Sequence, residues 1–157
     1  MEEDKAGRLG DLVADFYLHH GDYDQDETNG VNTAISWHAK DAIPDGALTV
    51  VVEYEDGLPL ILAATHSRLY ALDVEATSSS STSGAQTRCR SYTLDPDHVT
   101  VVHRATYRSA GSFRTSTWEI QLPDTTVRVP GHVYANGEAD EGELMSRLIV
   151  EALGWGK

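Results

Sequence analysis

The sequence predicts a mainly β fold of the α+β class, in which a small antiparallel sandwich or barrel is followed by one terminal helix. Residues 47–130 contain seven short strand-like segments, and turn-forming sequences such as Glu55-Asp56-Gly57 and Pro123-Asp124 separate several of them. Several short strands with frequent turn signals are typical of such a fold. An amphipathic segment follows at residues 140–153, where a helix can close an open end of the barrel over its core.

The predicted strands differ in how clearly their residues alternate. Trp118, Ile120 and Leu122 share one face of a strand, and Val127 and Val129 share one face of the next. Because successive side chains point to opposite faces, these two strands should each bury one face. The seven predicted strands are residues 47–54, 58–64, 68–74, 88–94, 98–104, 113–122 and 125–130. The Ser- and Thr-rich residues 75–87 predict a mobile loop.

Helices are predicted at both ends of the chain. Asp140 is a suitable N-cap for the terminal helix, with Glu143 three residues later as in a capping box. The residues of this helix that we expect in the core are Leu144, Met145, Leu148, Ile149, Ala152 and Leu153. Before the strands, residues 5–20 predict a helix, residues 22–30 a polar loop and residues 31–43 a short helix.

The net charge of −13 is unevenly distributed along the chain. Residues 1–48 contain 11 acidic and 3 basic residues, whereas residues 49–134 contain 9 acidic and 7 basic residues. We therefore predict two regions, an acidic N-terminal extension (1–46) and a β domain with its helix (47–157). Binding to nucleic acid or an anionic membrane would require a continuous basic face, so we expect neither as a partner.

The expected location is the cytoplasm. No apolar stretch approaches the ~18 residues of a membrane span. The acidic start, Met1-Glu2-Glu3-Asp4-Lys5, differs from the basic start of a secretory signal. Cys89 is the single cysteine, so an intrachain disulfide is impossible and a thiolate zinc site is not expected.

One hairpin resembles a known family. Residues 60–72 combine an apolar strand, a Thr-His-Ser turn and an Arg-Leu start of a second apolar strand. This pattern resembles the hairpin of bacterial PH-like (pleckstrin-homology-like) domains. Residues 92–99, and Trp118–Ile120 before a Val127-containing strand and a terminal helix, are also similar to that family. The resemblance spans residues 47–154 and implies a seven-stranded, strongly bent antiparallel barrel capped by the C-terminal helix.

This resemblance also implies a function. PH-like domains usually act as interaction modules, so it implies a non-catalytic protein-interaction or scaffold module that binds another protein and needs no cofactor. In PH domains that bind phosphoinositides the first hairpin turn is basic, whereas here it is Glu53-Tyr54-Glu55-Asp56-Gly57. Because this acidic turn would repel a phosphate, we expect no phosphoinositide or membrane binding.

A basic and aromatic group surrounds the turn between the fifth and sixth predicted strands. Its members are Arg104, Tyr107, Arg108 and Arg114. If the two strands form a hairpin, these residues gather at its tip on an otherwise acidic protein. We hypothesise that they contact an acidic partner; the alternative is that they are isolated arginines covering strand edges.

Two other functions fit parts of the sequence. The acidic residues Asp22, Asp24, Asp26 and Glu27 favour an inhibitor or immunity-type protein that neutralises a basic partner such as a nuclease. They do not form a calcium loop, because Glu27 stands where that loop requires glycine. A small hydrolase with a dispersed site is the third hypothesis, although the chain has no GxSxG motif.

The remaining chemistry-bearing residues predict no metal or thiol site. The seven histidines contain no HxH, HxxH or HExxH pair, so no metal site is expected. Cys89 lies between Arg88 and Arg90, and strand alternation places it on the face opposite both arginines. We therefore predict a buried, unreactive thiol at this position.

Overall fold

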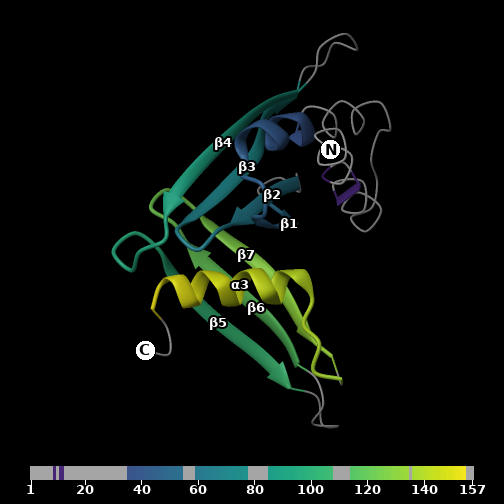
Figure 1. Cartoon of the computed structure of the whole chain (residues 1–157), viewed down its shortest axis with the longest axis vertical. Coiled ribbons are helices and arrows are strands. Elements are labelled where there is room, and N and C mark those ends of the chain that lie inside the picture. Colours follow the sequence, from purple (N-terminus) through teal and green to yellow (C-terminus); the bar gives the residue numbers. More distant parts are fainter. Residues whose placement is uncertain are drawn as a thin grey trace. The chain divides into compact units, whose positions relative to one another are not determined.

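The computed structural model describes residues 9, 11–12, 35–54, 59–77, 85–107, 114–134 and 136–154. The elements follow one another as β1 (Leu48–Glu53), β2 (Pro59–Ala64), β3 (Arg68–Thr77), β4 (Ala85–Thr93), β5 (Thr100–Tyr107), β6 (Arg114–Gln121), β7 (Thr126–Val133) and α3 (Glu141–Ala152) (Figure 1). Residues 35–42 form a further helix before β1. The mainly β fold, the seven strands and the terminal helix are thus confirmed.

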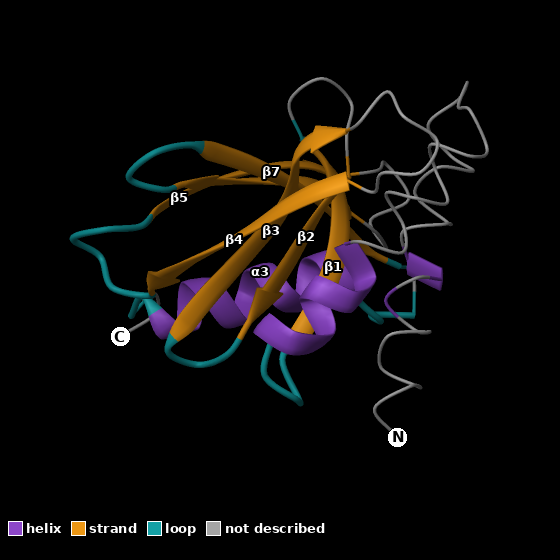
Figure 2. Cartoon of the chain, turned by 90° about the horizontal axis from the view of Figure 1, so that it is seen from above, coloured by secondary structure: helices purple, strands orange, loops and turns teal. Residues whose placement is uncertain are grey.

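The described strands pair into two antiparallel sheets rather than one closed barrel, which corrects the predicted architecture. One sheet has the order β1-β2-β3-β4 and the other the order β5-β6-β7 (Figure 2). In the second sheet Trp118 pairs with His103 of β5 and with Val129 of β7. Alternation within one strand predicts its buried face but not which distant strand it pairs with, and closure depends on that pairing.

The contacts divide the chain into two units. The first comprises Met1–Gly46, Val51–Leu62 and Tyr70–Arg90. Here the helix over 35–42 buries Ile35 and Ala39, and His38 Nδ1 lies 2.6 Å from Thr87 Oγ1 of β4. The successive residues Leu60, Ile61 and Leu62 of β2 are all buried, so this strand is covered on both faces.

The second unit comprises Ala47–Val50, Ala63–Leu69 and Ser91–Lys157. Trp118, Ile120, Val127 and Val129 are buried on one face of the β5-β6-β7 sheet, as alternation predicts. The helix α3 lies against this face (Figure 1). The backbones of α3 and β7 lie close together at Gly142, where an added Cβ atom would overlap the Pro130 carbonyl oxygen. Glycine therefore permits the packing of α3 on β7.

The turns between the strands are built as the sequence indicates. Thr65 N donates to Arg68 O across the His66-Ser67 turn, and Leu122 N donates to Thr125 O across Pro123-Asp124. Before β5, Asp95 Oδ1 accepts a hydrogen bond from Asp97 N at 2.7 Å, and Val99 N donates to Asp95 O. This turn delays β5 to Thr100, so the strand predicted over 98–104 starts two residues later and runs to Tyr107.

Two further predictions require correction. Residues 75–77 and 85–87 belong to β3 and β4 and not to a loop, while residues 78–84 lie outside the described residues. In α3, Leu144 is 44% exposed, whereas Gly142, Glu143, Met145, Ser146 and Ile149 are buried. The face of α3 that packs on the sheet is therefore rotated from the most apolar face, because small residues permit close approach there.

The N-terminal predictions are only partly covered by the structure. The short helix predicted over 31–43 is confirmed for residues 35–42, and its end is followed by Gly46 at φ +85°. The helix predicted over 5–20 lies outside the described residues except for the helical positions 9, 11 and 12, and the loop 22–30 lies outside them entirely. Within the described part of the chain, every helix is too short or too polar to cross a membrane.

Candidate functional site

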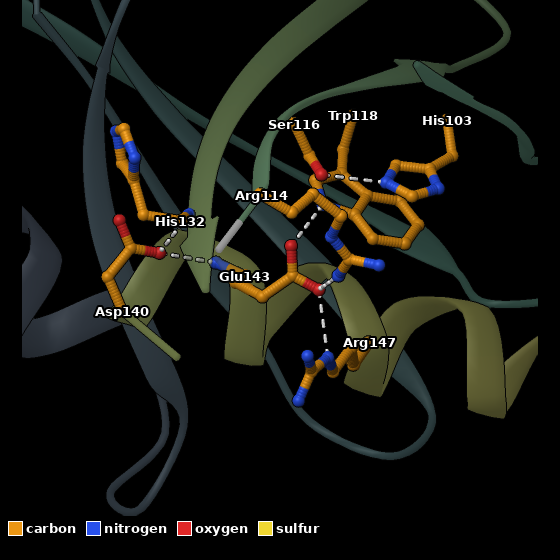
Figure 3. A network of polar contacts seen from close by, with 8 residues as sticks. All are labelled: His103, Arg114, Ser116, Trp118, His132, Asp140, Glu143 and Arg147. Atoms are coloured by element: carbon orange, nitrogen blue, oxygen red, sulfur yellow. Dashed lines mark hydrogen bonds and ion pairs between the residues drawn. The ribbon is translucent and has the colours of Figure 1, made fainter. Parts of the chain in front are cut away.

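The most distinctive group of polar side chains lies between α3 and the β5-β6-β7 sheet. We call it the Glu143 cluster, and Figure 3 shows its members together. It consists of Glu143, Arg114, Arg147, Trp118, His103 and Ser116. The side chains come from β5, β6 and α3, so the cluster joins the β5-β6 hairpin to a helix that begins 20 residues after the end of β6.

Glu143 is the centre of the cluster and is fully buried. Its Oε2 accepts a hydrogen bond from Arg114 Nη2 at 2.6 Å and another from Arg147 Nε at 2.8 Å. Its Oε1 accepts one from Trp118 Nε1 at 3.1 Å. A buried carboxylate is costly unless it is paired and hydrogen-bonded, and here two cations and an indole meet that requirement.

The start of α3 explains why Glu143 points inward. Asp140 is the N-cap, and its Oδ1 accepts from Glu143 N at 2.9 Å, as predicted. In a full capping box the Glu143 carboxylate would accept from Asp140 N. That N–H donates instead to His132 O at 3.0 Å. The predicted reciprocal half of the capping box is therefore absent, and the carboxylate extends to Arg114.

Gly131 makes room for the same carboxylate. A Cβ atom at this position would lie 2.9 Å from Glu143 Oε1 and 3.2 Å from Glu143 Cα. The absence of a side chain on β7 thus leaves space for a buried glutamate beside the strand. Gly131 and Gly142 together set the depth at which α3 packs.

His103 lies next to Trp118 within the cluster. The two rings are stacked, with centroids 3.7 Å apart and an interplanar angle of 14°. His103 Nε2 lies 2.8 Å from Ser116 Oγ in a hydrogen bond. Burial lowers the pKa of His103 below its ordinary value, and the Arg114 charge lowers it further, while Glu143 acts in the opposite direction. The imidazole is therefore neutral at pH 7.

A hydrogen-bonded serine and histidine raise the question of nucleophilic catalysis. Ser116 is only 6% exposed, and the face of the His103 ring is occupied by Trp118. The buried carboxylate that could orient a catalytic histidine is bonded instead to Arg114, Arg147 and Trp118. These contacts differ from those of a catalytic triad, in which the carboxylate orients the histidine beside the serine. They favour a structural role for the cluster, in which it anchors α3 to the sheet.

The predicted basic and aromatic group is divided by the structure. Tyr107 and Arg114 are opposite each other in the β5-β6 register, which brings the ends of the two strands together. Tyr107 is 71% exposed and the Arg104 side chain is 66% exposed, whereas the Arg114 guanidinium is bonded to Glu143. Arg108 lies outside the described residues.

The alternative acidic surface, Asp22, Asp24, Asp26 and Glu27, also lies outside the described residues. Among the residues that are described, no group of three or more His, Cys, Asp or Glu side chains could hold a metal ion.

A second group of charged residues lies around Cys89 of β4. Asp73 is 4% exposed, and its carboxylate accepts from Arg88 Nη2 at 3.0 Å and lies 3.7 Å from Arg90 Nη2. Cys89, between these arginines in sequence, is partly buried. Burial raises the pKa of its thiol, and the negative charge of Asp73 raises it further. The thiol is thus protonated at pH 7 and poorly nucleophilic.

Glu143 is buried although it was not among the residues of α3 that we expected in the core. A glycine inside a helix is unfavourable unless something approaches it closely. Gly142, three residues before Met145 and seven before Ile149, was the signal that this face of α3 packs on the sheet.

Comparisons with protein-family models, with curated proteins and with solved structures found no match to this chain.

Proposed function

We propose that this chain is a non-catalytic, PH-like cytoplasmic module that binds another protein, and that the exposed half of β5 is part of its contact surface. The observation that carries the proposal is the position of this strand. Among the described strands, β5 is at the edge of its sheet with β6 as its hydrogen-bonded neighbour. All four residues from Arg104 to Tyr107 are exposed.

An exposed edge strand is suited to binding an extended segment. Its outward backbone groups can pair with another chain, and side chains beside it then select the partner. Tyrosine and arginine are enriched among the residues that dominate interface energetics. Tyr107 and Arg104 provide both residue types on this half-strand.

The charge at this strand favours an acidic partner. Arg104 Nη1 lies 3.7 Å from Glu119 Oε2, and Arg128 Nη2 lies 3.5 Å from the other oxygen of the same carboxylate. Arg104 and Arg128 share the single carboxylate of Glu119, so these three residues together carry one positive charge in excess. The chain as a whole carries −13. The two arginine side chains are 66% and 72% exposed, and ion pairs whose cations are solvated are weak, so an acidic partner can compete with Glu119 for them.

Arg114, the fourth member of the predicted basic and aromatic group, is not part of the proposed contact surface. Its guanidinium is held by Glu143, so we assign it to anchoring β6 on α3 beside Tyr107 rather than to partner contact. The PH-like part of the proposal is supported by the order of elements, four strands in one sheet, three in the next and then a helix.

An acidic inhibitor of a basic protein is the alternative function. It is supported by the 11 acidic against 3 basic residues among positions 1–48. In that case the N-terminal acids, and not β5, would make the contact.

The experiment isolates binding partners on the immobilised chain of residues 1–157 and then measures the affinity of the main partner for the wild type and two variants. The double variant Arg104→Glu/Tyr107→Ala should bind at least about tenfold more weakly, because truncating interface tyrosines and arginines often costs 2 kcal/mol or more. Arg128→Glu is the matched control, since Arg128 pairs with the same Glu119 from the opposite strand. Equal affinities of wild type and the double variant, or an equal loss in Arg128→Glu, would contradict the proposed surface.

A further inference from the structure

His103 is a titratable group that the proposed binding function does not use. It lies on the face of β5 that is directed to α3, stacked on Trp118 and hydrogen-bonded to Ser116 (Figure 3). Its neighbour Trp118 is bonded directly to the buried Glu143 of α3. His103 is therefore connected to α3 through the side chain of Trp118, so a movement of the His103 ring can alter the contact between Trp118 and Glu143.

We propose that His103 is a pH-sensitive switch whose protonation releases its ring from Trp118 and loosens α3 from the β5-β6-β7 sheet. This property is independent of the proposed partner surface and of any partner.

We call the arrangement in which the His103 ring is stacked on Trp118 closed, and the one in which the ring is turned into water released. In the closed arrangement burial and the charge of Arg114 oppose protonation of His103, while Glu143 acts in the opposite direction. From β6, Arg114 presents a guanidinium, and from α3 the cluster includes Glu143 and Arg147. On β5 itself, Arg104 is directed to the opposite face, where it pairs with Glu119. On β7, His132 enters the neighbouring network through its backbone N–H, which donates to Asp140 Oδ1.

With His103 neutral, these two arginines and one glutamate leave one positive charge in the cluster. An added proton on His103, which is partly buried, makes two, next to the buried Trp118 and Glu143. Such an excess beside buried groups is unfavourable, because water screens the charges less there than in bulk solvent.

The direction of the pH effect follows from proton linkage. In the closed arrangement burial holds the pKa of His103 below 6.5, whereas a released, solvated imidazole has its ordinary value. Well above pH 6.5 the imidazole is almost entirely neutral in both arrangements, so pH has little effect through this group. As the pH falls below that value the released arrangement binds the proton more readily and gains population, until the closed arrangement is protonated as well.

Release of the imidazole would remove packing from Trp118. The indole would then be more exposed to water, which competes for its Nε1–H. Because this N–H is one of the three donors to Glu143, the attachment of α3 would weaken at its first turns.

The test measures hydrogen exchange of the α3 amides in the full chain at about pH 7.5 and about pH 5.5, scaled for the intrinsic exchange rate at each pH. The indole N–H resonance of Trp118 is followed over the same range by NMR and is assigned with Trp118→Phe. In the wild type we expect a several-fold loss of protection in α3 at the lower pH, together with a titrating Trp118 resonance.

Two variants at position 103 and one control decide the outcome. His103→Phe keeps a flat ring on Trp118 but cannot be protonated, and His103→Gln provides the same comparison should phenylalanine not fit. Both should abolish the pH-dependent loss, whereas His98→Gln, at an exposed histidine paired with Asp95, should retain it. Unchanged α3 protection in the wild type, or the same loss in the position-103 variants, would overturn the proposal.

Discussion

Trp118 Nε1 donates a hydrogen bond to Glu143 Oε1 at 3.1 Å, and this contact joins the middle of β6 to the first turn of α3. Trp118 and Glu143 are both buried, so water does not replace this hydrogen bond while the two side chains stay packed. A buried pair of this kind is strongly destabilising when one member is removed, because the other loses its compensation.

Replacing Glu143 should therefore be costly. We expect Glu143→Ala to lower the free energy of unfolding by about 3–5 kcal/mol, because Arg114 would remain partly buried without its carboxylate. Urea unfolding at pH 7 measures the loss. Glu141→Ala, at an exposed acid in the same turn, should cost at most about 1 kcal/mol. Equal losses in the two variants would show that burial of Glu143 is unimportant.

Gly142 should not tolerate a methyl group. In an unconstrained helix Gly→Ala is stabilising by up to about 1 kcal/mol. Here the new Cβ atom would overlap the Pro130 carbonyl oxygen, so we expect a loss of about 1–3 kcal/mol as in other overpacked sites. Thermal unfolding compares Gly142→Ala with Glu151→Ala on the exposed face of α3. A higher melting temperature for Gly142→Ala would contradict the close approach.

The buried face of α3 can be mapped by truncating its apolar residues. Ile149 and Met145 are fully buried, so Ile149→Ala and Met145→Ala should each cost about 2–5 kcal/mol. Leu144 is 44% exposed, and Leu144→Ala should change stability by no more than about 0.5 kcal/mol. Chemical denaturation of the three variants tests this order. A large loss of stability in Leu144→Ala would contradict this packing and would indicate that the most apolar face of α3 lies on the sheet.

The turn before β5 provides a test by titration. A hydrogen bond from His98 lowers the pKa of Asp95, and the backbone N–H of Asp97 lowers it further. An aspartate with a lowered pKa in the folded state contributes stability above its unfolded pKa and loses it as the pH falls through the folded value. We expect His98→Ala to raise the pKa of Asp95 toward 3.8, as measured by NMR of its carboxyl carbon. His66→Ala, at another exposed histidine, is the control and should leave the pKa of Asp95 as it is. An unchanged pKa of Asp95 in His98→Ala would rule out this contact.

Much of the fold could be predicted because it depends on local patterns. Alternation in β6 and β7 placed Trp118 and Val129 on a buried face, and two-residue turns marked where strands reverse. The division into two sheets could not be predicted in the same way. It depends on which strands pair across long sequence separations, and no local pattern in the chain encodes that choice.

The Glu143 cluster was beyond sequence reasoning for a related reason. Glu143 and Arg114 are 29 residues apart, and a glutamate in the first turn of a helix normally faces water. Its burial depends on Gly131 and Gly142, which let α3 approach β7. Hydrophobicity alone placed Leu144 in the core, because it takes no account of the space that two glycines provide.

We propose that the folded β5-β6-β7 sheet, and not the acidic N-terminal segment, binds the partner. The measurement that tests it most directly is the affinity of the captured partner for the full chain and for a chain lacking residues 1–30, at low salt and near 1 M salt. At about 1 M the screening length is roughly 3 Å, so attraction through the acids of residues 1–48 would be largely lost. We predict that affinity changes little with either treatment. Loss of affinity both at high salt and on truncation would contradict the claim and would assign the binding activity to the acidic segment.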